Sequence, residues 1–134
     1  MTTLLEPAPA SEASAPFWDA TRDQRLVLPW CTACDQAFWY PREVCPRCLG
    51  MRLEFRPASG AAVVHTVVVE HKVPSPMGDE GPYAVALVDL DEGVRMMTNV
   101  VGTPPADVTV GMAVQVTWEP LSDGRHLPLF EPAN

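Results

Sequence analysis

Four cysteines in two C-x-x-C pairs constrain this chain more than any other feature. The first pair is Cys31 and Cys34, and the second pair, Cys45 and Cys48, follows after ten intervening residues. A two-residue spacer lets both sulfurs of a pair point to one side of a tight turn, so four thiolates can surround one ion tetrahedrally. Such a site has no open coordination position. We therefore expect a single structural zinc ion and no catalytic metal.

Three other uses of the cysteines compete with zinc. Two disulfides would suit a secreted protein, but residues 1–15 contain no Lys or Arg and no apolar core of a secretory signal, which favours a cytoplasmic chain. A thioredoxin-like redox site needs one C-x-x-C beside a βαβ pattern, and the sequence shows no such pattern. Iron bound by the same four sulfurs stays open as the minor alternative to zinc.

Composition and charge limit the class of partner. The chain has 134 residues, 47% of them hydrophobic, and its 15 prolines favour short strands and turns over a helical bundle. The net charge is −8, and residues 61–134 contribute −7 of it, from three basic and ten acidic residues. Nucleic acids require a basic surface, so we expect no nucleic-acid partner. The apolar runs are too short for a membrane span.

The N-terminal region predicts an arm followed by a short helix. Residues 1–15 are rich in Pro, Ala, Ser and Glu, which is typical of a flexible arm. Residues 16–25 have Ser14 as a candidate N-cap and a proline in the first turn, as a helix start requires. A helix this short must dock on something. Phe17 and Trp18 could pack on the ribbon of this chain or on another subunit, and the sequence leaves both open.

The remaining sequence predicts a mainly β protein with two parts. Residues 26–58 form the expected zinc ribbon, in which strands lead into the first cysteine pair and out of the second. Residues 59–134 form the expected barrel, because five β-prone segments with little helix suit a small closed sheet. We expect a five-stranded OB-fold, with an SH3-like barrel as the alternative. The expected strands are residues 61–70, 83–90, 94–101, 113–119 and 126–130.

One long loop is a candidate for function, whereas catalytic patterns are missing from the sequence. Residues 72–82 contain three prolines and two glycines between two strong strands, and long loops on rigid barrels often carry binding residues. The sequence has no phosphate-binding glycine loop, nucleophile elbow or H-E-x-x-H. His65 lies within an apolar strand, where a structural role is the ordinary one. We expect no catalytic residues in this chain.

Taken together, these features resemble a known family. The chain is similar to small proteins that join a rubredoxin-like zinc ribbon to an OB-fold and are associated with acyl-CoA metabolism. The similarity covers nearly everything after the arm. It is carried by the four cysteines, by Pro16-Phe17-Trp18, by Val44-Cys45-Pro46, by Ser59-Gly60, by residues 82–88, by Thr98-Asn99-Val100-Val101-Gly102 and by Leu127-Pro128-Leu129-Phe130.

The resemblance implies a non-catalytic accessory subunit. Relatives of this kind associate with thiolase-superfamily enzymes, such as acyltransferases, acyl-CoA condensing enzymes and thiolase-like aldolases, and help to shape the acyl-CoA site. By that similarity we expect a hetero-oligomer with a thiolase-like subunit. The residues expected to contact the partner or acyl-CoA are Phe17, Trp18, Val73, Pro74, Pro82 and Tyr83. Two other functions stay open: a single-stranded nucleic-acid binder, and a free-standing acyl-CoA thioesterase or hydratase.

The sequence departs from the family at both cysteine pairs. The usual glycine after the second cysteine of each pair is Asp35 in the first pair and Leu49 in the second. Aspartate tolerates a left-handed backbone, but leucine there is strained. We therefore expect the second turn to adopt a different conformation, with metal binding unaffected.

Overall fold

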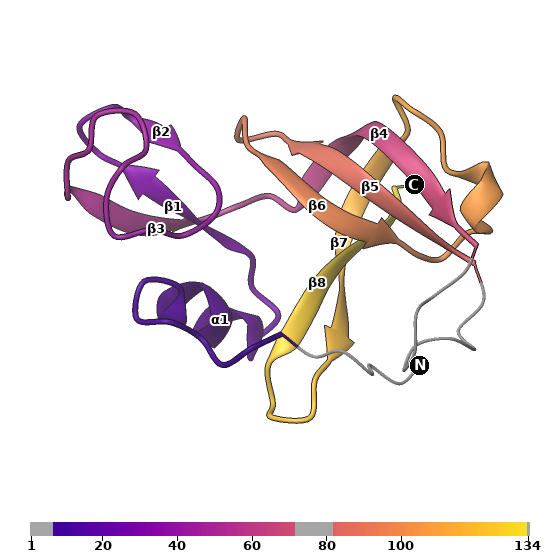
Figure 1. Ribbon diagram of the computed structural model, residues 1–134, viewed down its shortest axis with the longest axis horizontal. Helices are drawn as coiled ribbons and strands as arrows, with labels where there is room; N and C mark the ends of the chain where they lie inside the picture. Colours follow the sequence, from indigo (N-terminus) through magenta and orange to yellow (C-terminus); the bar gives the residue numbers. More distant parts are fainter. Residues whose placement is uncertain (1–6, 72–81, 134) are drawn as a thin grey trace.

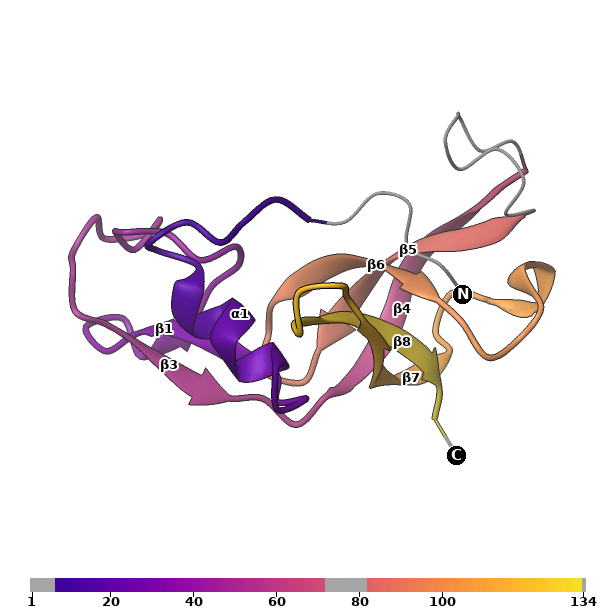
Figure 2. The same ribbon diagram turned by 90° about the horizontal axis from the view of Figure 1, so that it is seen from below.

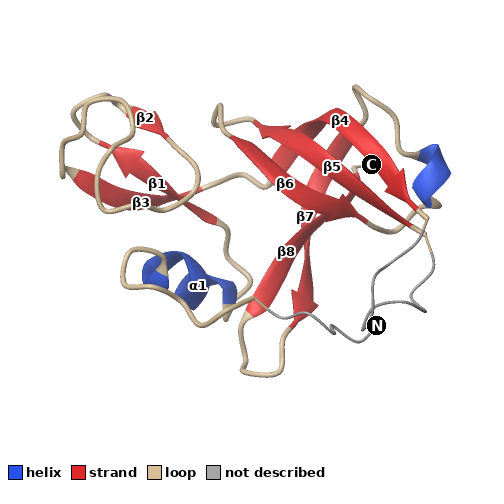
Figure 3. Ribbon diagram, viewed as in Figure 1, coloured by secondary structure: helices blue, strands red, loops and turns tan. Residues whose placement is uncertain are grey.

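The structure is a computed structural model that describes residues 7–71 and 82–133. It contains a short helix, a three-stranded antiparallel sheet and a closed five-stranded barrel (Figures 1 and 3). The elements in chain order are α1 (Ala15–Thr21), β1 (Val27–Cys31), β2 (Gln36–Ala37), β3 (Leu53–Pro57), β4 (Ala61–Glu70), β5 (Tyr83–Leu90), β6 (Arg95–Val100), η1 (Pro105–Asp107), β7 (Ala113–Pro120) and β8 (His126–Pro132).

The barrel confirms the mainly β prediction. Its strand order is β4-β5-β6-β8-β7, and all neighbours are antiparallel except β6 and β8, which pair in parallel at Val100 and Phe130. Strand β5 alternates buried and half-buried residues, so that Ala84, Ala86 and Val88 fill the interior. Closure leaves the barrel without free sheet edges, as expected for so short a domain.

The ribbon sheet places the cysteines at one end. Strand β1 lies in the middle, where Cys31 pairs with Gln36 on β2 and with Leu53 on β3. From Leu53, β3 runs along β1 to Pro57 and then leads into the barrel (Figure 1). The two cysteine turns therefore lie at the end of β3 that is opposite to the barrel connection.

Helix α1 is shorter than the predicted span of residues 16–25. It ends at Thr21 because Gln24 adopts a left-handed backbone with φ 56°, and the Arg25 N–H turns back to donate to the Ala20 carbonyl. Ser14 is the N-cap residue, as expected, but its hydroxyl bonds to Ser11 and makes no cap bond to the helix. No helix among the residues described has the length and apolar character needed to cross a membrane.

The helix packs against the ribbon of its own chain. The ring of Phe17 meets the ring of Trp39 edge to face, with centroids 5.0 Å apart. The Trp18 indole N–H donates to the Tyr40 hydroxyl over 3.0 Å. Phe17 and Trp18 are 1% and 7% exposed. Of the two docking sites that the sequence left open, the structure shows packing within this chain.

The same helix is bonded to the turn between β7 and β8 (Figure 2). The Arg22 guanidinium donates to the Asp123 carbonyl over 2.7 Å. His126 Nδ1 lies 2.8 Å from the Thr21 carbonyl oxygen, so this nitrogen carries the proton, and the His126 backbone N–H donates to the Thr21 hydroxyl. Helix α1 therefore joins the ribbon to the barrel.

Candidate metal centre

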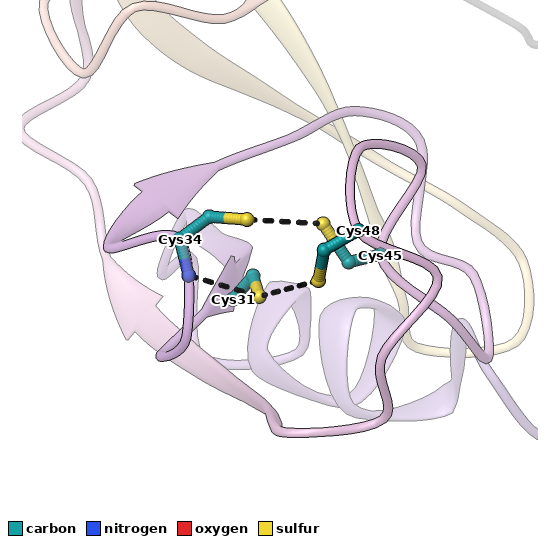
Figure 4. Close-up of side chains that lie close together, drawn as sticks. All are labelled: Cys31, Cys34, Cys45 and Cys48. Atoms are coloured by element: carbon teal, nitrogen blue, oxygen red, sulfur yellow. Dashed lines mark hydrogen bonds between the residues drawn. The ribbon is translucent and has the colours of Figure 1, made fainter.

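The four cysteine sulfurs lie together at the end of the ribbon (Figure 4). All four lie within 4.8 Å of one another. The Cys31–Cys48 and Cys34–Cys45 sulfur pairs are 3.8 and 4.0 Å apart. Zinc–thiolate bonds of about 2.3 Å in a tetrahedron place sulfurs about 3.8 Å apart. The donor set and its spacing therefore fit one zinc ion with four thiolate ligands.

Backbone N–H groups prepare the sulfurs for a negative charge. The N–H groups of Cys34, Arg47 and Gly50 donate to the sulfurs of Cys31, Cys45 and Cys48, each over 3.4 Å. The backbone N–H of Cys48, aided by that of Arg47, lowers the pKa of the Cys45 thiol to about 6. Hydrogen bonding to Cys48, together with burial, raises the pKa of Cys34 to about 12. Without metal, Cys45 therefore ionises at a lower pH than Cys34. A bound zinc ion displaces these protons.

Within each cysteine pair, the first cysteine is buried and the second is more exposed. Cys31 and Cys45 are buried and pack with Phe38, whereas Cys34 is half-buried and Cys48 is exposed. Phe38, in the segment between the two pairs, thus covers one side of the site. The other side faces the surface of the ribbon.

The expected change in the second cysteine turn is wrong. Leu49 takes the left-handed conformation that the glycine of relatives would take, with φ 60°, and Asp35 does the same in the first turn with φ 54°. The turn at Leu49 is held by two backbone bonds, from Cys45 N–H to the Gly50 carbonyl and from Leu49 N–H to the Cys45 carbonyl. These two bonds hold the backbone of Leu49 in a conformation that is strained for a residue other than glycine.

The predicted contact residues fall into three groups. Phe17 and Trp18 are buried within this chain and hold α1 to the ribbon. Pro82 is exposed, and Tyr83 is half-buried at the start of β5. Val73 and Pro74 lie outside the described residues, as does most of the long loop. The structure therefore brings no acyl-CoA site together from these residues.

An arginine that the sequence did not single out links three parts of the chain. Arg125 is only 4% exposed, and its guanidinium bonds to the carbonyls of Pro7 and Ala8 and to the Asp123 carboxylate. It also lies over the Trp18 ring, 4.9 Å from the centroid. The only sequence signal for this role is an arginine directly after an Asp-Gly turn in an acidic domain.

Titratable side chains on the barrel form surface ion pairs. Arg95 donates to Asp89 over 2.6 Å and to His65 Nδ1 over 3.2 Å, and all three side chains are partly exposed on the outer face. The Arg95 hydrogen bond lowers the pKa of Asp89. Among the residues that the structure describes, this cluster does not place a nucleophile beside a base in a pocket, as a catalytic site would require.

Comparisons with known proteins agree with both parts of the fold. A family model described as "ChsH2, rubredoxin-like zinc ribbon domain" matches residues 18–54, and one described as "ChsH2, C-terminal OB-fold domain" matches residues 55–119. A "DUF35 domain-containing scaffold protein" of Methanocaldococcus jannaschii is 32% identical over 117 residues, which cover 76% of this chain and 82% of that protein. The chain belongs to the DUF35 family. The family assignment identifies the four-cysteine cluster of this DUF35 chain as a zinc site and its barrel as an OB-fold, which removes the SH3-like alternative.

Longer relatives carry names of enzyme subunits. The "Probable enoyl-CoA hydratase alpha subunit" of Thermomonospora curvata is 38% identical to this DUF35 chain over 130 residues. The match covers 96% of this chain, which spans 40% of that relative's length. The "3-oxo-4,17-pregnadiene-20-carboxyl-CoA hydratase alpha subunit" of Mycobacterium tuberculosis is 41% identical over 121 residues, which cover 86% of this chain and 36% of that protein.

A solved structure matches over the whole fold. A chain of the "Ltp2-ChsH2(DUF35) aldolase" superposes with a TM-score of 0.85 and 35% identity, and covers 96% of this chain and 100% of that chain. A DUF35 protein of unknown function from Sulfolobus solfataricus superposes with a TM-score of 0.66 at 14% identity, which shows a shared fold alone.

Proposed function

We propose that this DUF35 chain is a non-catalytic subunit that binds a thiolase-superfamily enzyme and helps to shape its acyl-CoA site. The observation that supports it most is the match along the full length of a chain from the Ltp2–ChsH2 aldolase. The name "scaffold protein" of the archaeal relative supports an accessory role as well. The partner enzyme supplies the catalytic residues in this proposal.

The architecture suits a rigid adaptor. Zinc orders the ribbon, and α1 is bonded both to the ribbon and to the β7–β8 turn. A surface held at fixed geometry loses little conformational entropy when it binds a larger protein. Pro82 and Tyr83, at the mouth of the long loop, are the described residues that we assign to the acyl-CoA side of the complex.

The names of the longer relatives favour one second candidate. Both of these relatives are named as alpha subunits of hydratases that act on CoA thioesters. The complex could therefore add water to an enoyl thioester instead of cleaving a carbon–carbon bond. In that case this chain would correspond to the part of those relatives that it matches, 40% and 36% of their lengths.

A reconstitution experiment tests the proposal. The purified zinc-loaded chain is mixed with the aldolase subunit of the Ltp2–ChsH2 complex, and the mass of the product is measured by light scattering after gel filtration. We expect a stable hetero-oligomer whose aldolase activity exceeds that of the subunit alone. Assays of this chain alone with acyl-CoA and enoyl-CoA should show no turnover. Turnover by the isolated chain would overturn the accessory role and favour an independent thioesterase or hydratase.

A further inference from the structure

The turn around the second cysteine pair carries an exposed apolar cluster. Val44, Leu49 and Met51 are 37%, 72% and 77% exposed. They lie around one closed turn, because the Cys45 N–H bonds to the Gly50 carbonyl over 2.8 Å and the Leu49 N–H bonds to the Cys45 carbonyl over 2.9 Å. We call these three residues, together with Arg42 and Arg52 on either side, the second-knuckle patch.

The backbone at Leu49 disfavours the residue that occupies it. Its φ of 60° suits glycine and is strained for leucine. The Leu49 side chain is mostly exposed, so its burial in this chain does not offset that strain. The stability of the isolated chain therefore gives no reason for a leucine here, whereas burial against a second molecule would.

The charges of the patch differ from those of the barrel. Within the described residues, Arg42 and Arg52 make no ion pair, whereas the barrel arginines Arg95 and Arg125 are bound to Asp89 and Asp123. The patch thus presents two arginines without an ion pair around apolar side chains, and residues 42–52 carry a net charge of +2, from three arginines and Glu43, in a chain of net charge −8. The complementary surface is apolar at its centre and carries Asp or Glu at its rim.

The position of the patch favours a protein over a small ligand. Most of it lies on the turn that precedes Leu53, where β3 begins at the end opposite to the barrel connection. Small molecules bind in concave, enclosed sites, whereas protein surfaces also accept projecting turns. The exposed Cys48 lies within the same turn, so a protein seated on the patch would also shield the zinc site.

We propose that the second-knuckle patch is a docking surface for the enzyme partner, with Leu49 and Met51 inserted into an acidic-rimmed apolar hollow of that enzyme. This inference rests on the proposed function and adds the place of contact. The two hydrophobic side chains provide the affinity, and Arg42 and Arg52 orient the approach.

Two matched pairs of variants test the apolar part of the patch. Binding to the aldolase subunit of the Ltp2–ChsH2 complex is measured by calorimetry with zinc-loaded proteins. Met51→Ala should weaken binding about fivefold to tenfold, whereas Met97→Ala, the same change at a barrel residue of similar exposure, should leave the Kd unchanged. Leu49→Gly should weaken binding about tenfold or more while the zinc is retained. Asp35→Gly, the same change in the first cysteine turn, should leave the Kd unchanged.

Charge reversal tests the rim. Arg52→Glu should weaken binding and flatten the salt dependence of the Kd, because it removes an attraction that salt screens. Arg25→Glu is the control, since Arg25 is also an exposed arginine but lies between the helix and β1.

The outcomes separate the two proposals. If the wild-type chain binds and the Leu49 and Met51 variants bind equally well, the docking surface is wrong while the accessory role stands. If Met97→Ala is the variant that weakens binding, the barrel face carries the contact and the patch does not. If the wild-type chain does not bind, both the proposed function and the proposed docking surface are wrong.

Discussion

Leu49, next to the metal ligand Cys48, has a backbone conformation that suits glycine better than leucine. A leucine with φ 60° costs about 1–2 kcal/mol relative to its usual conformations, and a glycine costs about 0.5–1 kcal/mol in additional unfolded-state entropy. We predict that Leu49→Gly stabilises the isolated chain by about 0.5–1 kcal/mol, measured by urea unfolding at saturating zinc. Asp35→Gly should gain less, because aspartate tolerates this conformation. A loss of stability in Leu49→Gly would show that the side chain does pack in this chain.

Cys45 is a buried ligand of the cluster whose thiol pKa is lowered to about 6 by backbone N–H groups. We predict that Cys45→Ser removes the zinc and unfolds the ribbon, because structural zinc sites contribute on the order of 10 kcal/mol to folding. The metal content follows from mass spectrometry, and complex formation should be lost in parallel. A variant that loses its metal yet still binds the aldolase subunit fully would contradict the role of the ribbon in docking.

At the scale of elements, Arg125 joins the N-terminal segment to the β7–β8 turn and also contacts α1 through the Trp18 ring. This buried guanidinium satisfies two carbonyls of the arm and one carboxylate. We predict that Arg125→Met, which keeps the length of the side chain, destabilises the chain by about 2–3 kcal/mol, because those carbonyls lose charged donors. Arg25→Met, at an exposed position, should change stability by about 0.5 kcal/mol or less. Thermal unfolding of both variants measures the difference.

The same turn has a predictable response to acid. The backbone N–H of Arg125, followed by its side chain, lowers the pKa of Asp123 in the folded state. A depressed folded pKa gives stability that is present above the unfolded pKa of about 3.9 and is lost as the pH falls through the folded value. We predict that wild type and Asp123→Asn differ in stability at pH 6, and that the difference begins to shrink as the pH falls below about 4 and disappears below the folded pKa of Asp123. A difference that stays constant as the pH falls from 6 to 2 would assign the effect to packing.

The elements themselves were more predictable than their contacts. The strands at residues 61–70 and 83–90 have the predicted bounds, because β-branched runs end at clear turn signals. The helix ends four residues earlier than the predicted end at residue 25, since nothing in the sequence shows that Gln24 turns left-handed. The cysteine cluster follows from local spacing. In contrast, Arg125 and Trp18 are far apart in sequence, and local patterns do not reveal such pairs.

At the scale of the molecule, the zinc site and the barrel have different sources of stability. The small cluster of Cys31, Phe38 and Cys45 depends on the metal, whereas the barrel closes its own hydrogen-bonded ring of strands. We predict that a strong chelator exposes the amides of β1, β2, β3 and α1 to hydrogen exchange and leaves those of β4–β8 protected. Loss of protection in both parts at equal rate would show a single cooperative unit.

The position of α1 between the two parts limits how the domains can be recombined. A ribbon transplanted onto a foreign barrel would keep its cysteines but lose the β7–β8 turn, which holds Arg22 and Thr21. Exchange of the ribbon in engineered hybrids therefore requires the helix and residues 121–126 to move with it as one cassette.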